Sequence, residues 1–472
     1  MEDMSFFDSK DISWPADAQV YYPGTSAFTN ATTRWSIYEA PKYSAVALPT
    51  SEEIVAKIVK VARASNISIL ATGGRHGYCT TLGRLRGGLA IDLSQMNAID
   101  VDKVAGTVTV GAGTKLGDVT VPVEQAGYEF PIGSCPSVGT IGVTLGAGIG
   151  PFQGLFGLMI DCLISARLVT ADGDLVDVSE RDNPDLFWAI RGAGANFGII
   201  TSATYKLKKA VNDAQVFTVD AIYPADAKSA YFDVLQSFQD KMPAELALCT
   251  VILWDNDSNT TQILATFLYS GPESEARQVL APFLSLNPPV LRTNYVPYSH
   301  VQRTILFSSV PVMCTPGRIQ DIFSVNVRRF AAETLKSTFD KFDAFYKANP
   351  DGRSSTAVLE IFSNQAVAAV PDDATAYPWR DAKGNFMFQM SWPSLGNPVE
   401  EVANALASEL RQDIAATSGY PDLAVYVNYS HGDETIEQIY GKDKLPKLVQ
   451  LKKAWDPSNV FKYSNALPTE YP

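Results

Sequence analysis

The stretch Ala71-Thr72-Gly73-Gly74-Arg75-His76-Gly77-Tyr78 follows directly after the isoleucine-rich run Ile67-Ser68-Ile69-Leu70. A second glycine-rich stretch, Gly133-Ser134-Cys135-Pro136-Ser137-Val138-Gly139, comes later in the chain. Adjacent glycines let a backbone approach a pyrophosphate closely, because a Cβ would block the contact. His76 and Cys135 add an imidazole and a thiol, which can both bond covalently to an electron-poor cofactor. We therefore predict that the two loops hold the phosphates of a cofactor and attach it to the protein.

Each of these residues also has a plainer interpretation. A Gly-Gly pair often marks only a tight turn, and a buried cysteine is usually an inert apolar side chain. His76 is one of three histidines in the chain, and a lone histidine more often belongs to the core or the surface. The combination of both loops favours a functional site.

Bulk composition bounds the class of protein. A chain of 472 residues exceeds the usual size of one hydrophobic core, so two large lobes are expected. Hydrophobic residues make up 46% and charged residues 19%, which is typical of a folded enzyme. The net charge of −13 argues against nucleic acid or an anionic membrane as a partner, since binding phosphates needs a surplus of Lys and Arg.

The N-terminus and the cysteines indicate where the protein works. Met1 to Lys10 has no basic segment and no long apolar run, so it does not resemble a signal peptide. The chain has no run of about 18 apolar residues, the length that would span a membrane. We expect a soluble, intracellular (cytoplasmic) protein with neither a disulfide framework nor a metal site, because the cysteines are odd in number and scattered. They are Cys79, Cys135, Cys162, Cys249 and Cys314.

The residue composition and the secondary-structure pattern of the chain change near residue 208. Before it, short β-branched runs alternate with helical patterns, such as the helix that Ser51 would cap over residues 52–62. After it, glycines become rarer and long amphipathic helices alternate with strands, which suggests a sheet with helices on one face. We expect strands at 67–71, 89–93, 107–111, 246–254, 261–269, 356–362, 385–392 and 423–429, and helices from 115, at 229–241, 331–347 and 442–455.

Two other glycine clusters suggest a nicotinamide-binding fold only superficially. Gly146-Ala147-Gly148-Ile149-Gly150 and Gly192-Ala193-Gly194 do not match G-x-G-x-x-G, and neither has an acidic residue about 20 positions further on. Pro151 also interrupts the first cluster. Nicotinamide binding is therefore rejected.

Four ordered motifs resemble the berberine-bridge-enzyme-like group of the vanillyl-alcohol-oxidase (PCMH-type) flavoprotein superfamily. They span essentially the whole chain: Thr72 to His76 with Ile91-Asp92-Leu93-Ser94-Gln95-Met96-Asn97, Gly133 to Gly150, Leu186 to Gly198, and Tyr426-Val427-Asn428-Tyr429 with Trp455 to Phe461. The resemblance implies an α+β, two-domain PCMH-type FAD-binding fold whose substrate domain is an antiparallel sheet backed by helices. The implied parts are an FAD domain at 1–208, a substrate domain at 209–422, and a segment at 423–472 that returns to the FAD domain.

The same resemblance implies the cofactor and its attachment. His76 would bond the flavin 8α-methyl carbon and Cys135 would bond C6, giving bicovalent FAD. Val138 matches a position where a small residue admits oxygen, so an oxidase that produces hydrogen peroxide is expected. The implied cofactor-binding residues are Thr72, Gly73, Gly74, Arg75, His76, Gly77, Tyr78, Cys135, Pro136, Ser137, Val138, Gly139, Gly142, Val143, Gly146, Gly148, Ile149, Gly198, Ile200, Asn428 and Tyr429.

Tyr429 matches the tyrosine that serves as catalytic base in relatives that oxidise alcohols. A phenol has an unperturbed pKa of about 10, so a nearby cation or hydrogen bonds would have to lower it. It would take the hydroxyl proton while hydride passes to flavin N5; its plainer interpretation is a buried aromatic. Glu360 and Gln389 are the candidates for a second catalytic group.

Two positions depart from the family pattern, and the substrate stays open. Val143 stands where several relatives have a histidine, and Tyr377-Pro378-Trp379-Arg380 replaces a Pro-His-Arg turn. We expect the substrate to be a small alcohol or amine from secondary metabolism, with O2 as the oxidant. Three alternative functions stay open: a flavin-dependent cyclase, a dehydrogenase that passes electrons to a quinone or protein, and a non-catalytic binding protein. The aromatic residues of the substrate domain have two interpretations: they would stack on a substrate, or they would fill the core. These residues are Trp254, Tyr295, Tyr298, Phe307, Trp379, Phe388 and Trp392.

Overall fold

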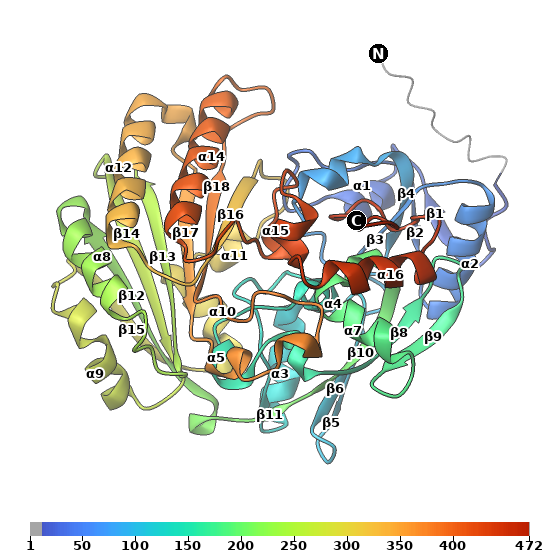
Figure 1. Cartoon of the computed structure of the whole chain (residues 1–472), viewed down its shortest axis with the longest axis horizontal. Coiled ribbons are helices and arrows are strands. Elements are labelled where there is room, and N and C mark those ends of the chain that lie inside the picture. The colour runs from blue at the N-terminus through green and yellow to red at the C-terminus, as the bar shows by residue number, and fades with distance from the viewer. Residues whose placement is uncertain (1–11, 472) are drawn as a thin grey trace.

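The computed structural model describes residues 12–471 (Figure 1). The stretch Met1 to Lys10, on which the expectation of no signal peptide rests, lies outside the described residues. Within residues 12–471, none of the helices is both long and apolar enough to cross a membrane.

Two larger sheets build the N-terminal half, beside a two-stranded sheet of β7 (Tyr128–Glu129) and β11 (Lys208–Lys209). In the first, β2, β4 and β3 are parallel neighbours, and β1 adds an antiparallel edge. The second is antiparallel throughout. The first sheet has the order β1 (Gln19–Tyr21), β2 (Lys42–Leu48), β4 (Arg86–Asp92), β3 (Ile69–Thr72), and the second β5 (Ile99–Asp102), β6 (Thr107–Gly111), β10 (Ile199–Lys206), β8 (Leu163–Val169), β9 (Leu175–Ser179).

Helix α2 (Glu52–Ala64) shows why the sequence folds as it does here. Ser51 accepts a hydrogen bond from the Ile54 N–H at 3.4 Å, which caps the helix as predicted. Val55, Ile58 and Val59 lie on its buried face, against the core of the first two sheets. The other helices of this half include α1 (Ser26–Thr32), α3 (Leu116–Gln125), α4 (Thr140–Gly146) and α7 (Pro184–Ala193).

A seven-stranded antiparallel sheet forms the second half. Alternation along each strand gives it two faces: Ile263, Ala265 and Phe267 of β14 enter a core under the helices, while Thr266 and Leu268 point the other way. Figure 1 shows α8 (Lys228–Ser237), α9 (Glu273–Leu284), α12 (Ala332–Ala348) and α14 (Val399–Thr417) on its outer side. The strand order is β15 (Val290–Pro297), β12 (Gln215–Pro224), β14 (Thr260–Tyr269), β13 (Leu246–Asp255), β17 (Thr356–Phe362), β18 (Gly384–Met390), β16 (Asp321–Val327).

Most of the predicted elements are confirmed, with ends shifted by a few residues. The strand predicted at 423–429 is wrong, because residues 423–426 are irregular and Val427–Tyr429 is a single 3-10 turn, η10. The segment bridges the two halves, and its polar groups find separate partners: Ala424 C=O accepts from Asn326 N–H, and Val425 N–H donates to Gln438 C=O. These backbone groups therefore form their hydrogen bonds without pairing to a neighbouring strand.

The C-terminal segment returns to the N-terminal half, where Figure 1 shows α15 (Ile436–Tyr440) and α16 (Leu445–Trp455) beside it. Lys452 and Asp456 form a fully buried ion pair of 2.7 Å, and Lys452 Nζ also donates to the Asn196 carbonyl. This pair fixes the Asp456-Pro457 turn to the motif around Asn196. The predicted domain limits at 208 and 422 stay predictions; β10 ends at Lys206 and β12 begins at Gln215.

Candidate functional site

A cavity of about 460 Å³ is lined by both glycine-rich loops, the helix-free face of the seven-stranded sheet and the C-terminal segment. It brings together most of the predicted site residues from widely separated parts of the sequence. Pro136, Ser137 and Gly148 are the predicted residues that do not line it. Those that do are Thr72, Gly73, Gly74, Arg75, His76, Gly77, Tyr78, Cys135, Val138, Gly139, Gly142, Val143, Gly146, Ile149, Gly198, Ile200, Glu360, Gln389, Asn428 and Tyr429.

Two glycines that line the cavity, Gly74 of the first loop and Gly142 of α4, have distinct tasks. A Cβ on Gly74 would lie 2.2 Å from the Gly139 nitrogen, so this glycine allows the two loops to pack against each other. A Cβ on Gly142 would meet no atom within 4 Å, although Gly142 lines the cavity. The first glycine is thus required by the protein itself, and the second leaves room for a ligand.

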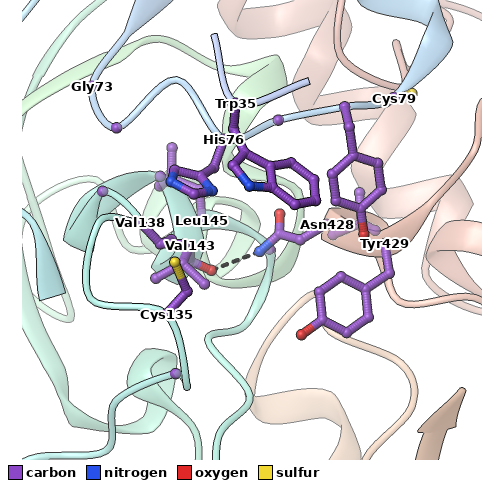
Figure 2. A pocket seen from close by; sticks show the side chains of 18 of the residues that line it. Trp35, Gly73, His76, Cys79, Cys135, Val138, Val143, Leu145, Asn428 and Tyr429 are labelled. Atoms are coloured by element: carbon purple, nitrogen blue, oxygen red, sulfur yellow. Dashed lines mark hydrogen bonds between the residues drawn. The ribbon is translucent and has the colours of Figure 1, made fainter. Parts of the chain in front are cut away.

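Two contacts hold the His76 ring in place. Its Nε2 lies 2.8 Å from Ser137 Oγ, and its ring stacks on Trp35 with 5.6 Å between centroids (Figure 2). Burial lowers the pKa of His76 to about 4, helped by the cations Arg34 and Lys115. The imidazole is therefore neutral at neutral pH, as a nucleophile must be.

Cys135 points toward His76 in Figure 2, and its Sγ lies 3.3 Å from Ser137 Oγ. Its sulfur is bonded to Cys314, whose Cα lies 6.4 Å from that of Cys135. The expectation that the cysteines form no disulfide is therefore wrong for this pair. The sequence could not show this pair because the two residues are 179 positions apart, and only the tertiary fold brings them together.

Tyr429 and Glu360 meet at the opposite wall of the cavity. The Tyr429 hydroxyl donates to Glu360 Oε2 at 2.9 Å. Burial raises the pKa of Glu360 to about 7, while the hydrogen bond from Tyr429 opposes the shift. Burial and the Glu360 carboxylate raise the pKa of Tyr429 well above its usual 10. The Tyr429 pKa therefore shifts opposite to the predicted lowering by a cation or hydrogen bonds, because burial disfavours the phenolate and the charged neighbour is an anion.

Gln389 lines the same cavity at another point of the sheet. Across the β17–β18 pair, Glu360 faces Asn385, whereas Gln389 faces Thr356. Four residues of strand separate Asn385 from Gln389, which corresponds to roughly 13 Å. The structure thus joins Glu360 to Tyr429 and leaves Gln389 apart from both.

The C-terminal segment is fixed to α4 by Asn428. Its Nδ2 donates to the Val143 carbonyl at 2.8 Å, the dashed line in Figure 2, and to Tyr426 Oη at 2.7 Å. A Cβ on Gly146 would lie 2.3 Å from Asn428 Oδ1, which explains this glycine. Gly148, outside the cavity lining, donates its N–H to Tyr426 Oη at 3.1 Å. Asn428 thereby sets the place of the next residue, Tyr429.

The cavity fits a flavin nucleotide in its polar groups and its space. Thr72 and Tyr78 line it, and within residues 12–471 their buried hydroxyl oxygens have no hydrogen-bond partner. Buried polar atoms are normally paired, so these two call for a polar ligand. Together with the open side of Gly142 and the neutral His76, they suit FAD.

Arg75 has a structural task as well. Its backbone is left-handed, with φ of 58°, and its guanidinium pairs with the fully buried Asp92 rather than facing the cavity with a free charge. Sequence reasoning missed Trp35 and the lining residues Ile305, Leu306, Val310 and Met313, because they lie outside the glycine-rich motifs. None of the seven aromatic candidates of the substrate domain lines the cavity, and Trp254, Tyr298, Phe388 and Trp392 are buried in the cores.

Two family models match parts of this chain. An FAD-binding-domain family model matches residues 43–179, and a berberine and berberine-like model matches 425–468. FAD-linked oxidoreductase OXR1 of Pyricularia oryzae is 46% identical over 455 residues, which cover 96% of this chain and 89% of OXR1.

Two solved structures share the fold. Physcomitrella patens BBE-like 1 superposes with a TM-score of 0.84 at 23% identity, covering 96% of this chain and 98% of that one. Acremonium strictum glucooligosaccharide oxidase, described with a 6-S-cysteinyl, 8α-N1-histidyl FAD, gives a TM-score of 0.82 at 24% identity, covering 97% and 98%. The predicted α+β PCMH-type fold is confirmed.

Proposed function

This chain belongs to the FAD-linked oxidoreductases of the berberine-bridge-enzyme-like group, and on that premise we propose that it is an oxidase of a small-molecule alcohol or amine. The proposal rests on one arrangement: the Tyr429–Glu360 pair lies on the wall of the cavity that His76 and Cys135 also line. A proton acceptor and two possible covalent anchors thus share one chamber.

His76 and Cys135 are the residues that would attach FAD. His76 Nε2 is hydrogen-bonded to Ser137 Oγ, which leaves Nδ1 as the nitrogen available for a bond to the cofactor. Cys135 needs a free thiolate for the same purpose, so an external thiol must first cleave its disulfide with Cys314 by thiol–disulfide exchange, in which two external thiols are oxidised to a disulfide as Cys135 and Cys314 are released. The bound flavin supplies a hydride acceptor that O2 reoxidises, with hydrogen peroxide as the product.

The Tyr429–Glu360 pair supplies the proton acceptor. Glu360, with a pKa of about 7, is partly ionised at neutral pH, whereas Tyr429 keeps its proton. The substrate hydroxyl would give its proton to Tyr429 Oη as Tyr429 passes its own to Glu360 Oε2. Glu360 is therefore the base and Tyr429 the relay, which changes the role that the resemblance assigned to the tyrosine.

The first experiment is a tryptic mass spectrum of acid-precipitated protein, together with its visible absorbance. FAD mass on the His76 and Cys135 peptides supports the bicovalent class, and a colourless protein contradicts the proposal. The second experiment reduces the flavin without oxygen and then admits air. Fast reoxidation with one hydrogen peroxide per flavin supports an oxidase, and slow reoxidation supports a dehydrogenase instead.

A further inference from the structure

The wall of the cavity that the seven-stranded sheet provides is mainly aliphatic. Val251, Leu268, Ile322, Val358 and Met387 point into it from five neighbouring strands. Three side chains of this wall carry oxygen or nitrogen. Thr266 Oγ1 donates to Asp220 and Glu360 accepts from Tyr429, while Gln389 lies four residues along β18 from the position that faces Glu360. The buried hydroxyl groups of Thr72 and Tyr78, which have no hydrogen-bond partner within residues 12–471, belong to β3 and to the glycine-rich loop that follows it.

A short segment, Ile305 to Cys314, covers this wall, and we call it the cover. It lines the cavity with Ile305, Leu306, Val310, Met313 and Cys314, which carry no oxygen or nitrogen in their side chains. Val310 belongs to the short helix α11 (Val310–Met313). The cover thus continues the apolar wall of the cavity that Tyr429 also lines.

The cover is fixed, because the buried Asp220 holds its bend. Leu306 and Phe307 are left-handed, with φ of 54° and 53°, a conformation that costs free energy in residues other than glycine. The Asp220 carboxylate accepts the N–H groups of both, at 2.9 and 3.0 Å. At its far end, Trp35 Nε1 donates to the Met313 carbonyl at 2.9 Å, which ties the cover to the N-terminal half.

This enclosure selects against sugars. An oligosaccharide carries a hydroxyl on most of its carbons, and each hydroxyl buried without a partner lowers affinity about 5- to 150-fold. On the same wall, the affinity for a hydrocarbon body rises about fourfold for each methylene group that is removed from water. The wall therefore suits a molecule that is polar only where it reacts.

We propose that the substrate is an alcohol with a hydrocarbon body, whose single reacting hydroxyl lies at Tyr429 and whose body lies between the sheet and the cover. Leu306, Val310 and Met313 determine this specificity. The inference rests on the proposed oxidase function and adds the substrate class to it. It sets this chain apart from the glucooligosaccharide oxidase that shares its fold.

The first test compares the n-alkanols from butanol to decanol with glucose and cellobiose on the holoenzyme. Anaerobic flavin reduction gives kcat/KM, and calorimetry measures binding without need of turnover. We expect kcat/KM to rise about fourfold per methylene until the chamber is full. Cellobiose as the better substrate, or alkanols that neither bind nor react, would overturn the inference; a protein without flavin would overturn only the oxidase function if alkanols still bind.

The second test uses two valines of the same short helix. Val310 lines the cavity and is 3% exposed, whereas Val312 is 62% exposed on the outer side. We expect Val310→Ser to lower the ratio of kcat/KM for n-octanol over n-butanol about tenfold or more, and Val312→Ser to leave this ratio unchanged. Equal ratios in both variants, with unchanged thermal stability, would show that the cover does not contact the substrate.

Discussion

The Tyr429 hydroxyl donates to Glu360 Oε2 at 2.9 Å, and both side chains line the same cavity as His76. The hydrogen bond joins the end of β17 to the C-terminal segment, 69 residues further on. It also couples the two protons, because Glu360 keeps Tyr429 protonated while Tyr429 favours ionised Glu360. The pH dependence of the reaction should therefore report on Glu360.

Flavin reduction should become faster as pH rises through about 7. The pKa of Glu360 is raised to about 7, and the carboxylate accepts a proton only above it. Glu360→Gln should remove this inflection and lower the rate about 10²- to 10⁴-fold. Stopped-flow absorbance between pH 5 and 9 measures both, and an unchanged inflection in Glu360→Gln would assign it to another group.

Tyr429→Phe should slow flavin reduction and move the inflection to higher pH. The hydrogen bond from Tyr429 holds the pKa of Glu360 down against its burial, so its loss raises that pKa further. A tyrosine with only a packing role would leave the pH profile in place. Tyr463 offers the control, because it also lines the cavity but its hydroxyl donates to Ser68 Oγ: Tyr463→Phe should leave the inflection near 7.

Cys314→Ser should increase the fraction of Cys135 that carries flavin. The disulfide and the bond to flavin compete for one sulfur atom, so each molecule can hold only one of them. A tryptic mass spectrum recorded without reductant measures both forms of the Cys135 peptide, the one that carries flavin and the one joined to the Cys314 peptide. Cys249→Ser serves as the control, because Cys249 also lines the cavity but is a free cysteine. A wild-type protein with neither modification on Cys135 would contradict the expectation.

The glycine-rich motifs and strand alternation were enough to predict much of the fold and part of the site. Alternation located β13, β14, β17 and β18, because one face of each strand packs under helices and the other faces the cavity. The same rule failed at 423–429. There Val425 and Tyr426 are buried by contacts between the two halves, not by a ladder.

The rest of the site depends on contacts between distant parts of the chain. The Cys135–Cys314 pair spans 179 residues, and the cover bends through non-glycine residues whose N–H groups are held by the distant side chains of Asp220 and Thr266. Local sequence carries no signal for either, since the bend lacks the glycine or asparagine that usually marks left-handed backbone. Glu360 could be named as a candidate from its strand, but its raised pKa follows from burial that only the fold creates.

The buried Lys452–Asp456 pair should account for a large part of the stability of the C-terminal segment. Both side chains are fully buried, and Asp456 also accepts the Val460 and Phe461 N–H groups at 2.7 and 2.9 Å. Asp456→Asn leaves the Lys452 ammonium buried without its counter-charge, which typically costs about 3–5 kcal/mol of unfolding free energy. Glu470→Gln is the matched control, because the Lys453–Glu470 pair is exposed and 3.8 Å long, and exposed pairs are worth about 0–1 kcal/mol. Urea unfolding measures both variants, and equal losses would mean that the buried pair contributes no more than a surface pair.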